Sequence, residues 1–136
     1  MNLKYTRDYK KIEETLPCTI VLGFDNRRIS SKAVWDTGAT NTCIGINHAH
    51  ALGCKLRGIR KGVELADGEK KDCYMAEIDI SLGGKNVFKD IPVTVFPEPQ
   101  KEVLLGMDII TKGSFVLTNK VTSKLRFDVP SVDFID

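Results

Sequence analysis

The sequence predicts a mostly β fold with one or two short helices, and two patterns support this. Apolar and polar residues alternate along 74–82, which is the period of a strand with one buried face. Clusters of Gly, Asp, Asn and Pro recur between such segments, as in turns that connect short strands. The 136 residues, 42% of them hydrophobic, suffice for one core. We therefore expect residues 1–136 to form a single domain. Its N-terminal arm, 1–16, has an unspecified structure, in which 8–15 fits either a short polar helix or an ordered segment.

The first half of the chain is expected to contain two strands followed by a short helix. Residues 18–24 and 29–35 are rich in β-branched and apolar side chains, with turn-forming residues between them. Asn47 is expected to cap a helix that continues through Leu52, and Gly53 is expected to end it.

The second half is expected to begin with a β-hairpin whose tip contains Asp67-Gly68, because Asp-Gly between extended segments is a strong hairpin signal. The return strand includes the alternating segment in which Tyr74, Ala76, Ile78, Ile80 and Leu82 share one face. Further strands are predicted at 87–96, 103–105, 115–117 and 124–127, with one or two helical turns at 107–112 stopped by Gly113.

The charge balance argues against a nucleic-acid-binding protein. Lys and Arg number 20 against 18 Asp and Glu, for a formal charge of +2, whereas nucleic-acid binders usually carry a clustered basic excess. Arg57, Arg60 and Lys61 are interpreted as solvated loop charges. We expect no nucleic-acid partner.

The cysteines and the N-terminus indicate a reducing environment. Cys18, Cys43, Cys54 and Cys73 form no Cys-x-x-Cys unit, which disfavours zinc and thioredoxin-type sites. Residues 1–7 lack the apolar run of a signal peptide, and no stretch is long enough to span a membrane. We therefore expect free thiols, a cytoplasmic location and no membrane association. Cys73 is expected to be a core thiol.

One group of potential metal ligands needs separate treatment. Cys43, His48, His50 and Cys54 are close in sequence, but on a helix the two histidines point to different faces. Surface histidines and buried thiols are the favoured interpretation, so no metal or other cofactor is expected.

Two short motifs indicate a specific chemistry. The turn Asp36-Thr37-Gly38-Ala39 directly follows an apolar segment, and about 65 residues later comes Val103-Leu104-Leu105-Gly106-Met107-Asp108-Ile109-Ile110. Each motif alone is common, but their combination in a β-rich chain of this length is specific. In these residues the sequence resembles the retropepsin-like aspartic proteases, and it looks closer to cellular and bacterial members than to viral ones. The resemblance spans residues 18–127 and implies a closed β-barrel of the acid-protease fold, with one lobe per chain.

The resemblance assigns roles to individual residues. Asp36 would be the catalytic carboxylate, Thr37 would brace the loop across a dimer axis, and Gly38 would bring its N–H close to the carboxylates. Ala39 would line the substrate cleft. The residues Leu104, Leu105 and Gly106 would pack behind the aspartate loop. The segment 63–76 would form a flap over the cleft, with its tip at Ala66, Asp67 and Gly68.

A single Asp-Thr-Gly supplies only one of the two carboxylates that this chemistry needs. The resemblance therefore implies a homodimer in which Asp36 of each chain meets at a two-fold axis. Such a pair shares one proton, activates a water and hydrolyses peptide bonds of an extended substrate. No cofactor is required.

The sequence also departs from the viral members of the family. Those usually carry an acidic residue after Asp-Thr-Gly-Ala and an arginine after the later glycine, where this chain has Thr40 and Met107. Trp35, before the aspartate, is expected to be a core residue.

Two alternatives stay open. One is a catalytically silent retropepsin-fold module for dimerisation or extended-peptide binding, and the other is an unrelated monomeric β-barrel with an accidental Asp-Thr-Gly turn.

Overall fold

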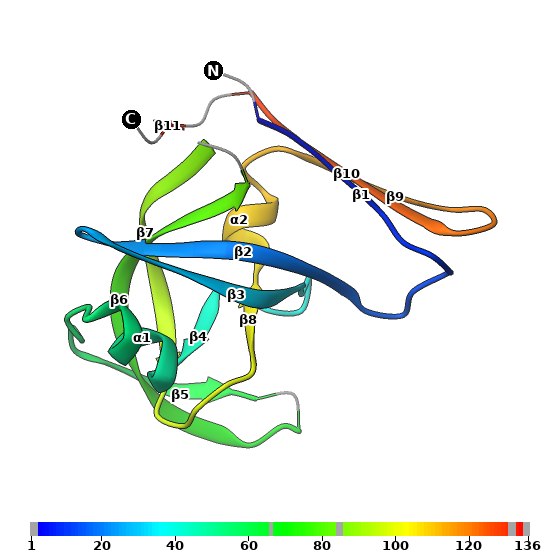
Figure 1. Cartoon of the computed structure of the whole chain (residues 1–136). Helices are drawn as coiled ribbons and strands as arrows, with labels where there is room; N and C mark the ends of the chain where they lie inside the picture. Colours follow the sequence, from blue (N-terminus) through cyan, green and yellow to red (C-terminus); the bar gives the residue numbers. More distant parts are fainter. Residues whose placement is uncertain (1–2, 66, 84–85, 131–132, 135–136) are drawn as a thin grey trace.

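The computed structural model describes residues 3–65, 67–83, 86–130 and 133–134 (Figure 1). Within these ranges it contains two short helices, α1 (Ile46–Leu52) and α2 (Met107–Ile110). The strands are β1 (Leu3–Asp8), β2 (Leu16–Phe24), β3 (Arg27–Trp35), β4 (Cys43–Gly45), β5 (Ile59–Glu64), β6 (Lys70–Gly83), β7 (Asn86–Phe96), β8 (Glu102–Leu105), β9 (Ser114–Asn119), β10 (Ser123–Val129) and β11 (Asp133–Phe134). The predicted mostly β fold with short helices is confirmed.

Six strands close into a barrel. Their order is β7-β4-β8-β3-β2-β6, and the antiparallel pairing of β6 with β7 completes the ring. Strand β5 continues the sheet beyond β6, and β11 lies beside β7. Closure leaves no unpaired edge among the six strands, so the edges of the larger sheet fall on β5 and β11.

Strands β3 and β8 place the two sequence motifs side by side. They run parallel, with Trp35 in register with Leu105, so both strands end at the same edge of the sheet. The backbone N–H of Asp36 donates to the carbonyl of Leu105 at 2.8 Å. Residues far apart in sequence therefore begin two loops that lie against each other.

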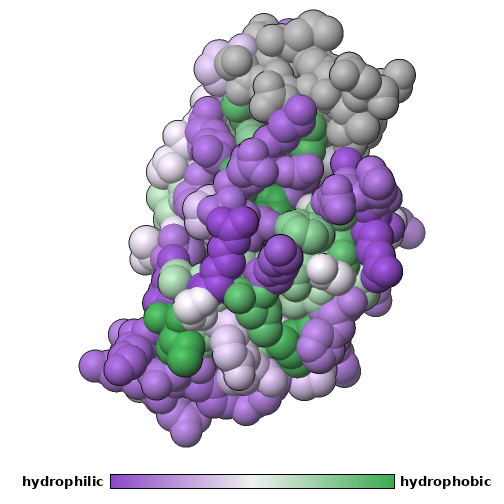
Figure 2. All heavy atoms as spheres, turned by 90° about the vertical axis from the view of Figure 1, so that its left-hand side faces the viewer, coloured by the Kyte–Doolittle hydropathy of each residue, from purple (hydrophilic) through white to green (hydrophobic). Residues whose placement is uncertain are grey.

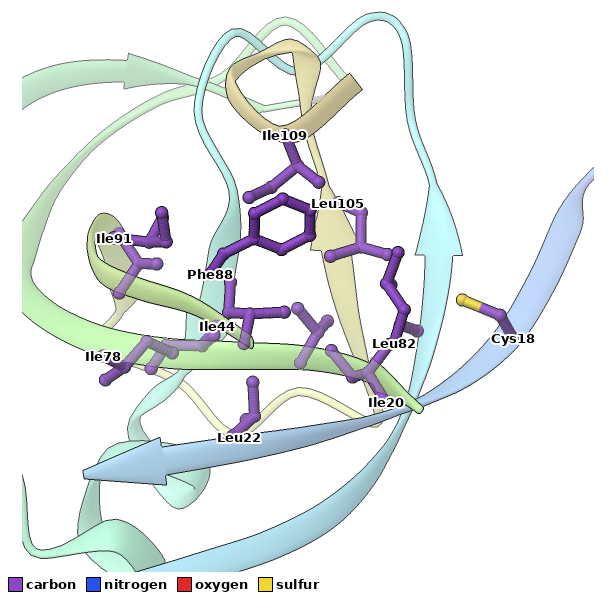
Figure 3. Close-up of a cluster of buried hydrophobic side chains, with 14 of the residues drawn as sticks. Cys18, Ile20, Leu22, Ile44, Ile78, Leu82, Phe88, Ile91, Leu105 and Ile109 are labelled. Atoms are coloured by element: carbon purple, nitrogen blue, oxygen red, sulfur yellow. The ribbon is translucent and has the colours of Figure 1, made fainter. Parts of the chain in front are cut away.

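The barrel interior is filled by aliphatic side chains with few polar neighbours. Ile44, Leu105 and Ile109 are fully buried, and Figure 3 shows them gathered with Phe88 of β7 and Ile78 of β6. Burial of this apolar surface supplies most of the drive for folding. This core therefore supports the ends of β3 and β8, from which the two motif loops begin.

The alternation predicted for the long return strand is largely present. Ala76, Ile78, Ile80 and Leu82 are buried on one face of β6. Tyr74 differs, because it is 38% exposed at the point where β6 continues from the barrel wall into the hairpin with β5.

The N-terminal arm is extended and pairs with the C-terminal hairpin. Strand β1 joins β10 and β9 in a three-stranded antiparallel sheet, and residues 10–15 contain no helix. This result selects the ordered-segment alternative. Trp35 anchors the sheet to the barrel, as its ring lies 5.2 Å from that of Phe115 and 5.4 Å from that of Phe127. Trp35 is buried, as expected.

Helix α1 begins earlier than predicted. Gly45 is its N-cap, and the Gly45 N–H donates to Nδ1 of His48 at 2.9 Å. Asn47 was expected to be the cap, but its side-chain amide forms two 2.9 Å hydrogen bonds with the backbone of Gln100. A side chain occupied in this way is not available for capping. Gly53 ends the helix with a φ of 66°, as predicted.

Hydrophilic side chains cover much of the barrel's outer surface. Figure 2 shows the face on the left of Figure 1, where hydrophilic residues surround smaller hydrophobic areas. Within the described part of the chain, no helix has the length and hydropathy of a membrane-spanning segment.

Candidate active site

The loop after β3 presents the Asp36 carboxylate at the mouth of a cavity. Its backbone N–H is fixed to β8, and its carbonyl accepts from the N–H of Ala39 at 3.2 Å. The Gly38 N–H donates to Oδ1 of Asp36 at 2.9 Å, as the glycine's expected role requires. A Cβ at Gly38 would lie 3.2 Å from the same oxygen. The carboxylate is thus oriented by the backbone while remaining partly exposed.

The second motif packs directly beneath this loop. Met107 N–H donates to the carbonyl of Ala39 at 2.8 Å, and Asp108 N–H donates to that of Thr40 at 3.2 Å. A Cβ at Gly106 would lie 2.7 Å from the carbonyl oxygen of Ala39, closer than real atoms approach. Only glycine allows the two backbones to lie this close.

The other residues of the second motif have different surroundings. Leu105 is fully buried behind the loop. Leu104 alternates to the other side of β8 and lines the cavity beside Asp36. Thr37 is exposed at the surface of the chain, and Ala39 is half-buried against the cavity.

Asp108 and Thr42 form a partly buried hydrogen-bond network that was not predicted from the sequence. The Thr42 hydroxyl donates to Oδ1 of Asp108 at 2.7 Å, and the Thr42 N–H donates to Oδ2 at 2.9 Å. The same hydroxyl accepts from the Gly106 N–H at 3.2 Å. Thr42 has no exposed surface and Asp108 is half-buried, so these bonds join the two loops in a partly water-excluded place. The one available signal was an acidic residue in the first turn of α2.

The hairpin predicted around Asp67-Gly68 is present between β5 and β6, and we call this hairpin the flap. Leu65 and Glu69 pair through a 2.8 Å backbone hydrogen bond, and the Asp67 carboxylate accepts from the Glu69 N–H at 2.9 Å. Gly68 has a φ of 85°, which favours glycine at the tip. The expected tip residue Ala66 lies outside the described residues. Figure 1 shows this hairpin, the loop after β3 and the three-stranded sheet all on one side of the barrel.

A cavity of about 550 Å³ lies between the flap and the aspartate loop. The flap and the aspartate loop both contribute to its wall, together with the start of β4 and the last residues of β7. The lining residues are Asp36, Gly38, Ala39, Thr40, Asn41, Cys43, Arg60, Lys61, Gly62, Val63, Glu64, Leu65, Thr94, Phe96 and Leu104. This volume falls within the range of small-ligand sites, and an extended peptide could occupy it in part.

Arg60 corrects one interpretation made from the sequence. It was taken as a solvated loop charge, but it lies on β5 and is half-buried. Its Nη1 donates to the hydroxyl of Thr94 at 2.8 Å, inside the cavity. Arg57, by contrast, is exposed and pairs with Glu77 at 3.4 Å. A strand pattern cannot show which basic side chain faces inward when a bulge shifts the register between Arg60 and Val63.

The potential metal ligands are dispersed. His48 is buried rather than on the surface, and its Nε2 lies 3.2 Å from the hydroxyl of Ser31. Burial lowers the pKa of His48. Burial also raises the pKa of Cys43 to about 12, and Cys73 is a buried core thiol as expected. Within the described ranges, no three His, Cys, Asp or Glu side chains gather as a metal site would require.

Comparison with known proteins supports this reading of the loops. Residues 23–112 match the family model described as "gag-polyprotein putative aspartyl protease". A search of the curated proteins finds no match. A retropepsin-like aspartic protease from Rickettsia conorii has a similar crystal structure. The TM-score is 0.65 with 21% sequence identity, over 95% of this chain and 96% of that one. With both motif loops in contact beneath a flap and the family model spanning most of the chain, this chain belongs to the retropepsin-like aspartic proteases.

Proposed function

We propose that the chain is an aspartic endopeptidase that acts as a two-fold symmetric homodimer, with Asp36 from each copy forming the catalytic dyad. One observation supports this above all others: the backbone orients Asp36 toward an open cavity and leaves its second oxygen without a partner among the described residues. A carboxylate held in this way is available to water and substrate.

A second copy is the best source of the other catalytic carboxylate. Within this chain, Asp108 is the acid beside the loop, but both of its oxygens accept hydrogen bonds from Thr42. Glu64 also lines the cavity, but it belongs to the flap hairpin and not to the floor. A two-fold axis beside the Asp36 loop would bring two identical loops together. The exposed Thr37 would then lie at the contact.

The dyad would hydrolyse a peptide bond without a covalent intermediate. Two neighbouring carboxylates share one proton, because both cannot ionise side by side. The ionised member would take a proton from water as the water oxygen attacks the scissile carbonyl carbon. The protonated member would donate to the carbonyl oxygen. Proton transfer to the amide nitrogen would then break the C–N bond, giving a carboxylic acid and an amine.

The substrate would be a peptide segment in extended conformation. The flap and the cavity wall are both built of strands, and an extended chain can pair with exposed strand backbone. Closure of the flap would exclude water and align the scissile bond. Four free thiols fit a reducing compartment, so we place the reaction in the cytoplasm.

The experiment is cleavage of a peptide library by the native protein and by Asp36→Asn, from pH 4 to 8. Asp25→Asn is the matched control: it makes the same chemical change in the β2–β3 turn, where φ is 55° and asparagine is tolerated. We expect cleavage by the native protein and by the control, and none by Asp36→Asn. The molar mass of each variant in solution should correspond to a dimer at the assay concentration.

Two results would contradict the proposal. Cleavage that survives Asp36→Asn would assign the activity to another group. A protein that binds peptides as a dimer but cleaves none, with binding unaffected by Asp36→Asn, would identify the chain as a peptide-binding module.

A further inference from the structure

Arg60 lines the same cavity as Asp36, the proposed catalytic residue. Its Nη1 is fixed by the hydroxyl of Thr94, a residue on β7 with 1% exposure. Thr94 is itself fixed, because its N–H donates to the carbonyl of Thr42 at 3.0 Å. Thr42 belongs to the network beneath the aspartate loop. The guanidinium is therefore held in a defined place relative to Asp36 by a chain of hydrogen bonds.

The charge of Arg60 has no counterion among the described residues. The ion pairs in those ranges join Arg57 with Glu77, Lys71 with Glu98, Lys124 with Asp8, and Arg126 with Asp128. A guanidinium carries five N–H donors, and the Thr94 contact uses one. The others have no hydrogen-bond partner among the described residues.

The neighbouring groups do not neutralise this cation. Burial raises the pKa of Cys43 to about 12, so its thiol is uncharged at any pH where an aspartic protease works. Of the other charged residues lining the cavity, Lys61 and Glu64 share strand β5 with Arg60, but neither forms an ion pair with it within the described ranges, and Asp36 is the proposed catalytic group. A half-buried cation that lacks a protein anion favours an anionic ligand, because partial exclusion of water strengthens the attraction.

We propose that Arg60, anchored by Thr94, forms a subsite that selects a glutamate or aspartate side chain of the peptide substrate. The proposal rests on the proposed function and adds the class of substrate to it. Guanidinium and carboxylate groups match in shape and form paired, charge-assisted hydrogen bonds. Cys43, Thr94 and Phe96 form the adjoining wall and would pack against the methylenes of the acidic side chain.

Symmetry adds a second, sharper expectation. A homodimer places one Arg60 on each side of the axis that relates the two aspartates. Acidic side chains should therefore be favoured at equivalent positions on both sides of the scissile bond. A monomeric or asymmetric site would favour them on one side only.

The preference should also depend on ionisation. A substrate glutamate has a pKa near 4.3, so its attraction to Arg60 is present above that pH and fades below it. Replacing glutamate with glutamine removes the charge and keeps the shape. Matched peptides of this kind separate the subsite from general peptide binding.

The test compares kcat/KM for peptide pairs that differ only by Glu or Gln at one position. We expect the native protein to favour the Glu peptide by about tenfold at pH 6, as for a hydrogen bond to a charged group. Arg60→Met should abolish the discrimination, and Arg60→Glu should redirect it toward Lys at the same position. Arg57→Met is the control, since Arg57 is exposed and paired on the outer surface, and it should leave the discrimination unchanged.

The outcomes separate this proposal from the proposed function. If the native protein cleaves both peptides equally at every position, the subsite is overturned and the protease stands. Fluorescence anisotropy with the same labelled peptides provides a readout that does not need hydrolysis, using the native protein and Asp36→Asn. Tighter binding of the Glu peptide that is lost in Arg60→Met supports the subsite, even without cleavage. Equal binding of both peptides, or binding of neither, overturns it.

Discussion

Asp36 and Asp108 follow two strands that lie side by side, yet their carboxylates have opposite surroundings. Asp36 accepts one hydrogen bond, from the N–H of Gly38, and faces the cavity. Asp108 accepts from the hydroxyl and the N–H of Thr42 and from the N–H of Ile109. The comparison shows how one chain can hold two aspartates at one site and leave only one of them open to the cavity. The other joins the loops.

The largest expected effects come from replacing the two aspartates: one variant should lose activity and the other should lose stability. Asp36→Asn should lower kcat by at least about 10³-fold, because it removes the carboxylate proposed to transfer the proton. Its free energy of unfolding should change by less than about 0.5 kcal/mol. Asp108→Ala should lower the free energy of unfolding by about 3 kcal/mol, because it leaves several donors without partners. Urea denaturation at one protein concentration, together with cleavage rates, checks both. Equal destabilisation by the two variants would erase the distinction.

The two glycines extend the comparison to the backbone. Gly106→Ala places a Cβ 2.7 Å from the Ala39 carbonyl oxygen, so main chain must move, and we expect a loss of about 2–3 kcal/mol. Gly38→Ala meets only the Asp36 carboxylate at 3.2 Å. That variant should fold normally and lose about tenfold in activity, since the new methyl group displaces the carboxylate of Asp36, the proposed catalytic residue. Thermal denaturation and cleavage rates of both variants would show whether Gly106→Ala mainly lowers stability and Gly38→Ala mainly lowers activity.

Thr42 gives a smaller effect and a direct rescue. Thr42→Val keeps the shape and removes the hydroxyl that joins Asp108 to the Gly106 N–H, which should cost about 2 kcal/mol. Thr42→Ser keeps the hydroxyl and should recover most of that loss. A serine variant as unstable as the valine variant would assign the role of Thr42 to packing instead.

The smallest expected effect concerns His48, which should change how stability depends on pH but not how cleavage depends on pH. His48 is buried and its pKa is lowered, so the unfolded chain binds a proton more readily. This group therefore stabilises the fold fully above its unfolded pKa of about 6.5. The contribution is lost as the pH falls through the lower folded pKa. His48→Gln should flatten the fall of stability below pH 6.5 without moving the pH profile of cleavage. A shift of that profile would link His48 to the site.

Local patterns in the sequence were sufficient to predict much of the fold. The alternation along β6 predicted a half-buried strand, and Asp67-Gly68 predicted a hairpin, because each signal depends on neighbouring residues. The two motifs indicated the aspartate loop and the glycine beneath it. Their contact follows from the parallel pairing of β3 with β8.

Features that depend on distant partners were missed. Asp108 and Thr42 are 66 residues apart, so neither reveals the other. Asn47 fits a capping residue in isolation, but its amide is taken by Gln100. The inward position of Arg60 depends on a bulge in β5, and alternation cannot predict where such a bulge falls.

The hydrogen bond from Asp36 to Leu105 also limits how early during synthesis the loop after β3 can fold. Leu105 lies 69 residues after Asp36, so the ribosome must add this whole segment before the loop after β3 gains its support. Contacts between such distant segments form late in folding, because a long loop must close first. A nascent chain of this protein therefore carries its Asp-Thr-Gly turn in an unsupported form until Leu105 has left the ribosome.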